Sequence, residues 1–94
     1  MLVERSELMI KPGLEDEFDA AVAEKAVTVL KGVEGVLSVQ VGRGIENPDK
    51  FMLLVGWQSL DAHKAYGDTP ASQEVRAIMG PYLAGGAMEH FELA

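Results

Sequence analysis

The chain has 94 residues, of which 48% are hydrophobic and 24% are charged, a composition typical of one globular domain. Its 8 Lys and Arg residues against 15 Asp and Glu residues give a net charge of −7. This charge argues against nucleic acid and anionic membranes as partners, because both bind cationic surfaces. Cysteine is absent, which excludes disulfides, thiolate metal sites and cysteine nucleophiles.

No targeting signal or membrane-spanning segment is visible in the sequence. The N-terminal segment MLVERSE is rich in charge and is not followed by an apolar run. The longest strongly apolar stretch, residues 51–57, is far shorter than the ~20 residues that a membrane helix needs. We therefore expect residues 1–94 to form a single cytoplasmic domain.

The first third of the chain predicts a strand followed by a long helix. Residues 2–10 form the strand, which stops at Pro12-Gly13, where proline lacks a backbone donor and glycine permits unusual backbone angles. In residues 14–31, apolar residues recur every three or four positions, and acidic residues occupy the first turn, where the helix dipole favours anions. Gly32 is the expected left-handed residue that ends this helix.

Two further strands are predicted after the helix. In residues 36–45, the side chains of Leu37, Val39 and Val41 are expected to share one face. Residues 50–58 are apolar on both faces. That pattern indicates a central strand that is covered on both sides.

The last part of the chain predicts two short helices and a final strand. Ser59 can cap a helix over residues 60–66, and Thr69 can cap a second helix over about residues 70–80. A strand is expected over residues 87–93. The order β-α-β-β-α-α-β predicts a ferredoxin-like α+β sandwich, βαββαβ with its second helix split in two.

The helices of such a sandwich cover only one face of the sheet, whereas the strand over residues 50–58 needs cover on both. A second copy of the chain is the simplest cover for the other face, because an open apolar face promotes aggregation. We therefore expect a homodimer that forms through the sheet face.

Short motifs follow one another along nearly the whole chain. They are Ser6-Glu7-Leu8 leading to Lys11-Pro12-Gly13 and Glu17-Phe18, then Val33-Glu34-Gly35-Val36, then Trp57-Gln58-Ser59 with Pro70, and finally Glu89-His90-Phe91. Together they resemble the antibiotic biosynthesis monooxygenase family, which includes quinol monooxygenases and IsdG-like haem-degrading enzymes. The resemblance implies a dimeric α/β barrel made by two ferredoxin-like chains. It also implies oxidation of phenolic or quinol-type substrates without metal or flavin, in a pocket between sheet and helices.

Such chemistry needs a dry cavity, a group that deprotonates a phenol and a donor that holds the resulting oxyanion. The catalytic candidates are His63, Tyr66 and Arg76. The substrate-binding candidates are Ser6, Trp57 and His90. Histidine is included because its charge changes near neutral pH.

Each candidate also has a purely structural interpretation. Trp57 can be a core residue, and His63 can be a solvated surface residue. His90 can serve as a structural or dimer-interface residue. Arg76 can be a surface charge that pairs with a neighbouring acid.

A haem-degrading role is not expected. Ser6, Tyr66 and Arg76 stand where the haem-degrading enzymes use an asparagine, a tryptophan and a histidine, so the axial imidazole is missing. The two histidines, His63 and His90, are too far apart in the sequence to form a local metal-binding motif. We therefore predict no metal and no cofactor.

The sequence favours a cofactor-independent monooxygenase that acts on a small aromatic or quinol-type substrate. One alternative is a non-catalytic dimer of the same fold that binds a small apolar ligand. Another is a structural dimer with a filled core. The fold alone does not decide among these functions, because one scaffold hosts many of them.

Overall fold

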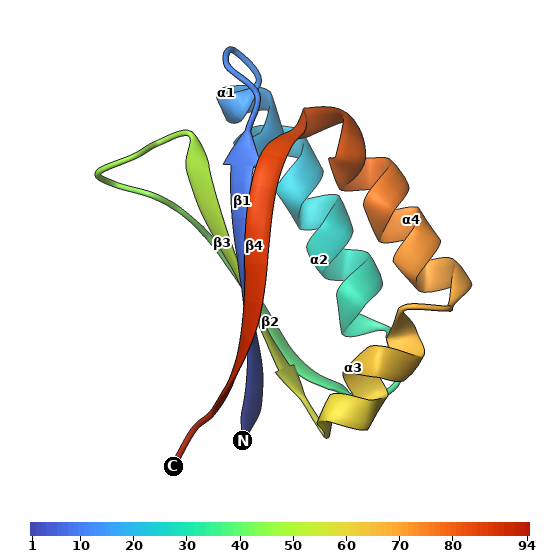
Figure 1. The fold of residues 1–94 in the computed structure, drawn as a ribbon. Coiled ribbons are helices and arrows are strands. Elements are labelled where there is room, and N and C mark those ends of the chain that lie inside the picture. Colours follow the sequence, from blue (N-terminus) through green and yellow to red (C-terminus); the bar gives the residue numbers. More distant parts are fainter.

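The computed structural model describes all 94 residues, with an antiparallel four-stranded sheet that carries helices on one face (Figure 1). The strands lie in the order β2-β3-β1-β4, so β3 and β1 are central. The strands are β1 (Leu2–Ile10), β2 (Val36–Arg43), β3 (Lys50–Trp57) and β4 (Leu83–Glu92). The helical segments are α1 (Glu15–Glu17), a π-helical turn (Phe18–Val22), α2 (Ala23–Lys31), α3 (Leu60–Tyr66), α4 (Pro70–Met79) and a 3-10 turn (Gly80–Tyr82). This order confirms the predicted ferredoxin-like α+β fold and the predicted central position of β3.

The register of the strands decides which side chains face the helices. Glu4 of β1 lies opposite Val55 of β3 on one side and opposite His90 of β4 on the other. Ser6 lies opposite Leu53. Because side chains alternate between the faces of a sheet, all five residues share the helix side. The sheet therefore brings polar groups from the two ends of the chain together.

The core lies between the sheet and the helices, and aromatic rings form much of it. Phe18, Phe51, Val55 and Trp57 are the largest fully buried side chains. Phe18 and Phe51 pack edge to face with ring centroids 4.9 Å apart, an arrangement that the quadrupoles of aromatic rings favour. Burying one side chain of this size stabilises the fold by about 1.5–3 kcal/mol.

The predicted long helix is continuous, but it is not α-helical throughout. A π-helical turn separates α1 from α2, and its first and last residues, Phe18 and Val22, are both buried. Arg43 of β2 reaches this region and pairs with Asp16 at 2.9 Å and with Asp19 at 3.4 Å. An apolar spacing of three to four residues does not distinguish the wider turn from an α-helix, so the sequence did not predict it.

The left-handed glycine after this helix is Gly35, and the prediction of Gly32 was wrong. Gly32 has a φ of −89°, whereas Gly35 has a φ of +88°. The chain makes a further hydrogen-bonded turn before β2, and Gly35 lies in it. A Cβ atom on Gly35 would lie 2.7 Å from the Cβ of Ala62 in α3. Only glycine therefore lets this turn approach α3 so closely.

Two strands differ in detail from their predictions. The pairing of β2 with β3 shifts register between Val36 and Ser38, and this bulge leaves Leu37 61% exposed. Val39 is buried as expected, so Leu37 does not share its face. β4 begins earlier than predicted, at Leu83.

Helices α3 and α4 begin where their caps were predicted. The Ser59 hydroxyl accepts a hydrogen bond from the Ala62 N–H at 3.1 Å. The Thr69 hydroxyl accepts one from the Ser72 N–H at 3.3 Å. Each cap satisfies an N–H group that the helix itself leaves unpaired. None of the helices has both the length and the apolar character needed to cross a lipid bilayer.

The other face of the sheet carries no helix (Figure 1). Met52 of β3 and Phe91 of β4 are 37% and 44% exposed on this outer face. Arg5 lies among them and pairs with Glu7 and with Glu89, at 3.1 Å in each case. The outer face is therefore partly apolar and open in the single chain.

Candidate functional site

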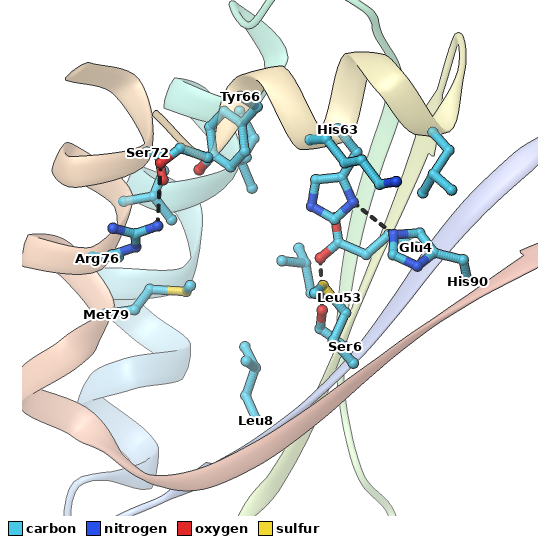
Figure 2. A pocket seen from close by; sticks show the side chains of 16 residues that line it. Glu4, Ser6, Leu8, Leu53, His63, Tyr66, Ser72, Arg76, Met79 and His90 are labelled. Atoms are coloured by element: carbon cyan, nitrogen blue, oxygen red, sulfur yellow. Dashed lines mark hydrogen bonds and ion pairs between the residues drawn. The ribbon is translucent and has the colours of Figure 1, made fainter. Parts of the chain in front are cut away.

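A cavity of about 420 Å³ opens between the sheet and the helices α3 and α4 (Figure 2). Its volume lies within the usual range for small-molecule pockets. Most of the predicted site residues line it, namely Ser6, His63, Tyr66, Arg76 and His90. Trp57 is 1% exposed and does not belong to the lining, so its side chain supports the site from within the core.

Polar groups lie on two sides of this cavity. His63 and His90 lie together on one side, and Arg76 lies across from them beside Met79 (Figure 2). Leu8 contributes apolar surface from the sheet. The cavity lining therefore combines polar groups on two sides with apolar surface.

The sequence analysis missed Glu4, which organises the polar side of the cavity. Its carboxylate is buried, and the whole residue is 7% exposed. Its Oε1 atom accepts a hydrogen bond from the indole N–H of Trp57 at 3.0 Å and lies 3.2 Å from Nε2 of His63. The Ser6 hydroxyl donates to Oε2 at 2.6 Å. These three partners offset the cost of removing a carboxylate from water.

One signal in the sequence could have revealed Glu4. Along β1, alternate residues from Glu4 through Ser6 to Leu8 and Ile10 point to the same face. A carboxylate on the same face of a strand as the core residues is buried, so it needs hydrogen-bond donors on that side of the sheet. The sequence analysis predicted the strand over residues 2–10 but gave Glu4 no role.

His63 is held on three sides and is not a solvated surface residue. Its side chain is 13% exposed. Its ring stacks on the indole of Trp57, with centroids 4.5 Å apart and planes inclined by 15°. Its Nε2 atom faces Glu4, and its Nδ1 atom lies 2.7 Å from Nε2 of His90. The fixed ring leaves neither of its nitrogens free.

Burial lowers the pKa of His63, because it removes the charged imidazolium from water. The charge of Glu4 opposes this shift, and His90 adds to it. His63 is therefore held in its neutral form over a wider pH range than a histidine in water.

Tyr66 and Arg76 complete the lining from α3 and α4. The Tyr66 ring lies 5.5 Å from the Trp57 ring, and burial raises the pKa of its phenol, while a hydrogen bond with Ser72 opposes the shift. The Arg76 guanidinium donates to the backbone carbonyl of Gly67 at 3.3 Å. It forms no ion pair with a neighbouring acid, so its charge is available to the cavity.

The histidines and carboxylates do not form a group that could hold a metal ion. The geometry around His63 gives the reason. Its two ring nitrogens are directed at Glu4 and at His90, on opposite sides of the ring. The three side chains thus form a hydrogen-bonded chain and do not converge on one point.

The comparisons with known proteins agree with this architecture. The profile of the antibiotic biosynthesis monooxygenase family matches residues 1–78. The uncharacterised protein YczJ of Bacillus subtilis (strain 168) is 31% identical over 94 residues, which cover 98% of each chain.

Solved structures also resemble the chain over almost its whole length. A protein of Bordetella bronchiseptica, provisionally described as an antibiotic biosynthesis monooxygenase, superposes with a TM-score of 0.89 at 27% identity, covering 99% of this chain and 96% of the other. A protein of Caulobacter crescentus with the same provisional description gives a TM-score of 0.80 at 26% identity, covering 99% and 89%. With the fold, the family profile and these relatives in agreement, the chain belongs to the antibiotic biosynthesis monooxygenase family.

Proposed function

We propose that the chain, acting as one domain over residues 1–94, is a cofactor-independent monooxygenase that oxidises a small aromatic or quinol-type substrate. The observation that carries this proposal is the cavity under α3 and α4, with a histidine pair on one side and an unpaired guanidinium on the other. Membership of the family supports the reaction class.

The proposed reaction takes its electrons from the substrate itself. A hydroquinone and dioxygen give a hydroxyquinone and water. One oxygen atom enters the ring, and the other leaves as water with the two hydrogens that the substrate loses. Loss of a phenolic proton prepares the ring for oxidation, because the phenolate gives up electrons more readily than the phenol.

The lining residues suit the separate parts of this reaction. The histidine pair of His63 and His90 accepts the phenolic proton. Arg76 holds the opposite oxygen of the substrate and stabilises negative charge that develops there. Tyr66 packs against the substrate ring, and Ser6 adds a hydroxyl at the sheet.

We also propose that two chains associate through the outer face of the sheet. Met52 and Phe91 are partly exposed on this face, and Leu54, which follows Met52 on the same face of β3, is half-buried. A second copy would cover this apolar surface and complete the dimeric α/β barrel.

Oxygen uptake by the purified protein with a panel of hydroquinones tests the proposed activity. We expect stoichiometric formation of a hydroxyquinone, with kcat/KM at least about tenfold lower in Arg76→Gln. Lys31→Gln removes an exposed cation at the end of α2 and serves as the control that keeps full activity.

Two other outcomes would contradict a monooxygenase. A ligand-dependent rise in melting temperature without oxygen uptake would favour the non-catalytic binding protein. The absence of both oxygen uptake and a melting shift would favour the structural dimer.

A further inference from the structure

We infer that Glu4, His63 and His90 form a hydrogen-bonded relay in which His90 is the base that accepts the proton, and Glu4 and His63 are positioning residues. This inference rests on the proposed function, because the proton that His90 accepts is that of a phenolic substrate. It assigns a direction to the histidine pair, which the proposed function leaves open, and it gives a role to the buried Glu4.

The direction follows from the hydrogen bonds. The carboxylate of Glu4 has no proton to donate, so at 3.2 Å His63 must donate to it through Nε2–H. Neutral His63 has a single ring proton, and its Nδ1 atom is then an acceptor. The contact of 2.7 Å between His63 Nδ1 and His90 Nε2 therefore requires the hydrogen to be on His90.

The same count of protons identifies the base. Neutral His90 with a hydrogen on Nε2 keeps its lone pair on Nδ1. His90 is exposed at the edge strand β4 and lines the cavity, so a substrate can reach its ring, whereas His63 has both nitrogens occupied. When the phenolic O–H bond breaks, the proton moves to His90 Nδ1, and the electron pair stays on the phenolate oxygen.

The surroundings of His63 disfavour a charge on its ring. Burial lowers the pKa of His63, and the indole of Trp57 holds its ring in place. Glu4 lies directly opposite His90 across the β1–β4 pairing and supplies the compensating negative charge. The other charged groups nearby are Glu92 on the same face of β4, with Lys64 and Arg76 in the cavity lining.

Two substitutions separate charge from geometry. In Glu4→Gln, the amide oxygen can still accept from Trp57 and His63, and the amide N–H can donate to the Ser6 oxygen, so mainly the charge is lost. In His90→Gln, the amide N–H can still donate to His63, but it cannot take up a proton. Glu74→Gln, exposed on α4 and outside the cavity lining, is the matched control.

The test uses 4-nitrophenol, whose phenolate is yellow, at a pH below the pKa of the free phenol. We expect wild type and Glu74→Gln to bind the probe as its phenolate. The bound phenolate fraction should fall at least about tenfold in His90→Gln and in Glu4→Gln. Because His90 lies on the exposed strand β4, we expect His90→Gln to fold. It therefore keeps the test valid if Glu4→Gln does not fold.

A second readout needs no ligand. The ring ¹⁵N shifts should show both histidines with their hydrogen on Nε2. A hydrogen on Nδ1 of His63, no saturable binding of the probe, or an equal phenolate band in His90→Gln would overturn the relay.

Failure of the relay and failure of the proposed function give different results. Phenolate formation without oxygen uptake from any hydroquinone supports the relay and contradicts the monooxygenase. Oxygen uptake without phenolate formation contradicts the relay and leaves the monooxygenase standing.

Discussion

The carboxylate of Glu4 in β1 accepts a hydrogen bond from the indole N–H of Trp57 in β3 at 3.0 Å, and both residues are buried. The first prediction concerns this bond. Trp57→Phe keeps an aromatic ring but leaves one lone pair of a buried carboxylate without its donor. We expect the free energy of unfolding to fall by about 2 kcal/mol or more, because hydrogen bonds to buried charged groups contribute about 1.5–3 kcal/mol. Urea unfolding monitored by far-UV circular dichroism measures this change, and an unchanged midpoint would show that the bond contributes nothing.

The second prediction is that acid weakens the fold through His63. Its pKa in the folded chain is lowered from the value of 6.5, chiefly by burial, so between the two pKa values the unfolded chain binds more protons than the folded one. Stability therefore rises with pH in this window, and the contribution of His63 is lost as the pH falls below 6.5.

Urea midpoints measured at about pH 5.5 and at about pH 7.5 test this sign. His63→Phe keeps a ring against Trp57 but cannot titrate. The urea midpoint of this variant should change less between the two pH values than that of the wild type, whatever its overall stability. A difference as large as that of the wild type would exclude His63 as its source.

The sequence predicted the fold because the decisive signals are local. The strand over residues 50–58 is apolar on both faces, which marks it as central without reference to any other segment. Ser59 and Thr69 cap their helices through bonds to N–H groups only three residues away. Spacing alone did not reveal the π-helical turn or the bulge at Leu37, since both alter the backbone without changing the apolar pattern.

The candidate site depends on contacts that no local pattern contains. His63 and His90 are 27 positions apart, and they meet only because β4 pairs beside β1 while His63 of α3 reaches Glu4 of β1 from the helix side. Sequence reasoning selected both residues from their chemistry. It could not predict that the two side chains contact each other, and without that contact no role for the buried Glu4 was evident.

The third prediction concerns the turn between α2 and β2. Gly35→Ala would force an alanine into a φ of +88° and bring its Cβ within 2.7 Å of Ala62. We expect a loss of about 2 kcal/mol in the free energy of unfolding, of the order found for strained backbone positions. Gly80→Ala, where a Cβ meets nothing within 4 Å and φ is negative, is the control and should be neutral. Equal unfolding midpoints for the two variants would contradict this account of Gly35.

The last prediction tests the proposed association through the outer face of the sheet. Sedimentation equilibrium at micromolar concentration should give a dimer for the wild type. Met52→Asp places a charge at a position that is 37% exposed on this face, and it should shift the chain to monomer because the charge would have to be buried between the sheets. Ile45→Asp adds the same charge in the loop before β3, where the side chain is 90% exposed, and it should leave the dimer intact. A wild-type monomer would contradict the proposed association, and a dimer that Ile45→Asp disrupts and Met52→Asp does not would move the interface away from the sheet.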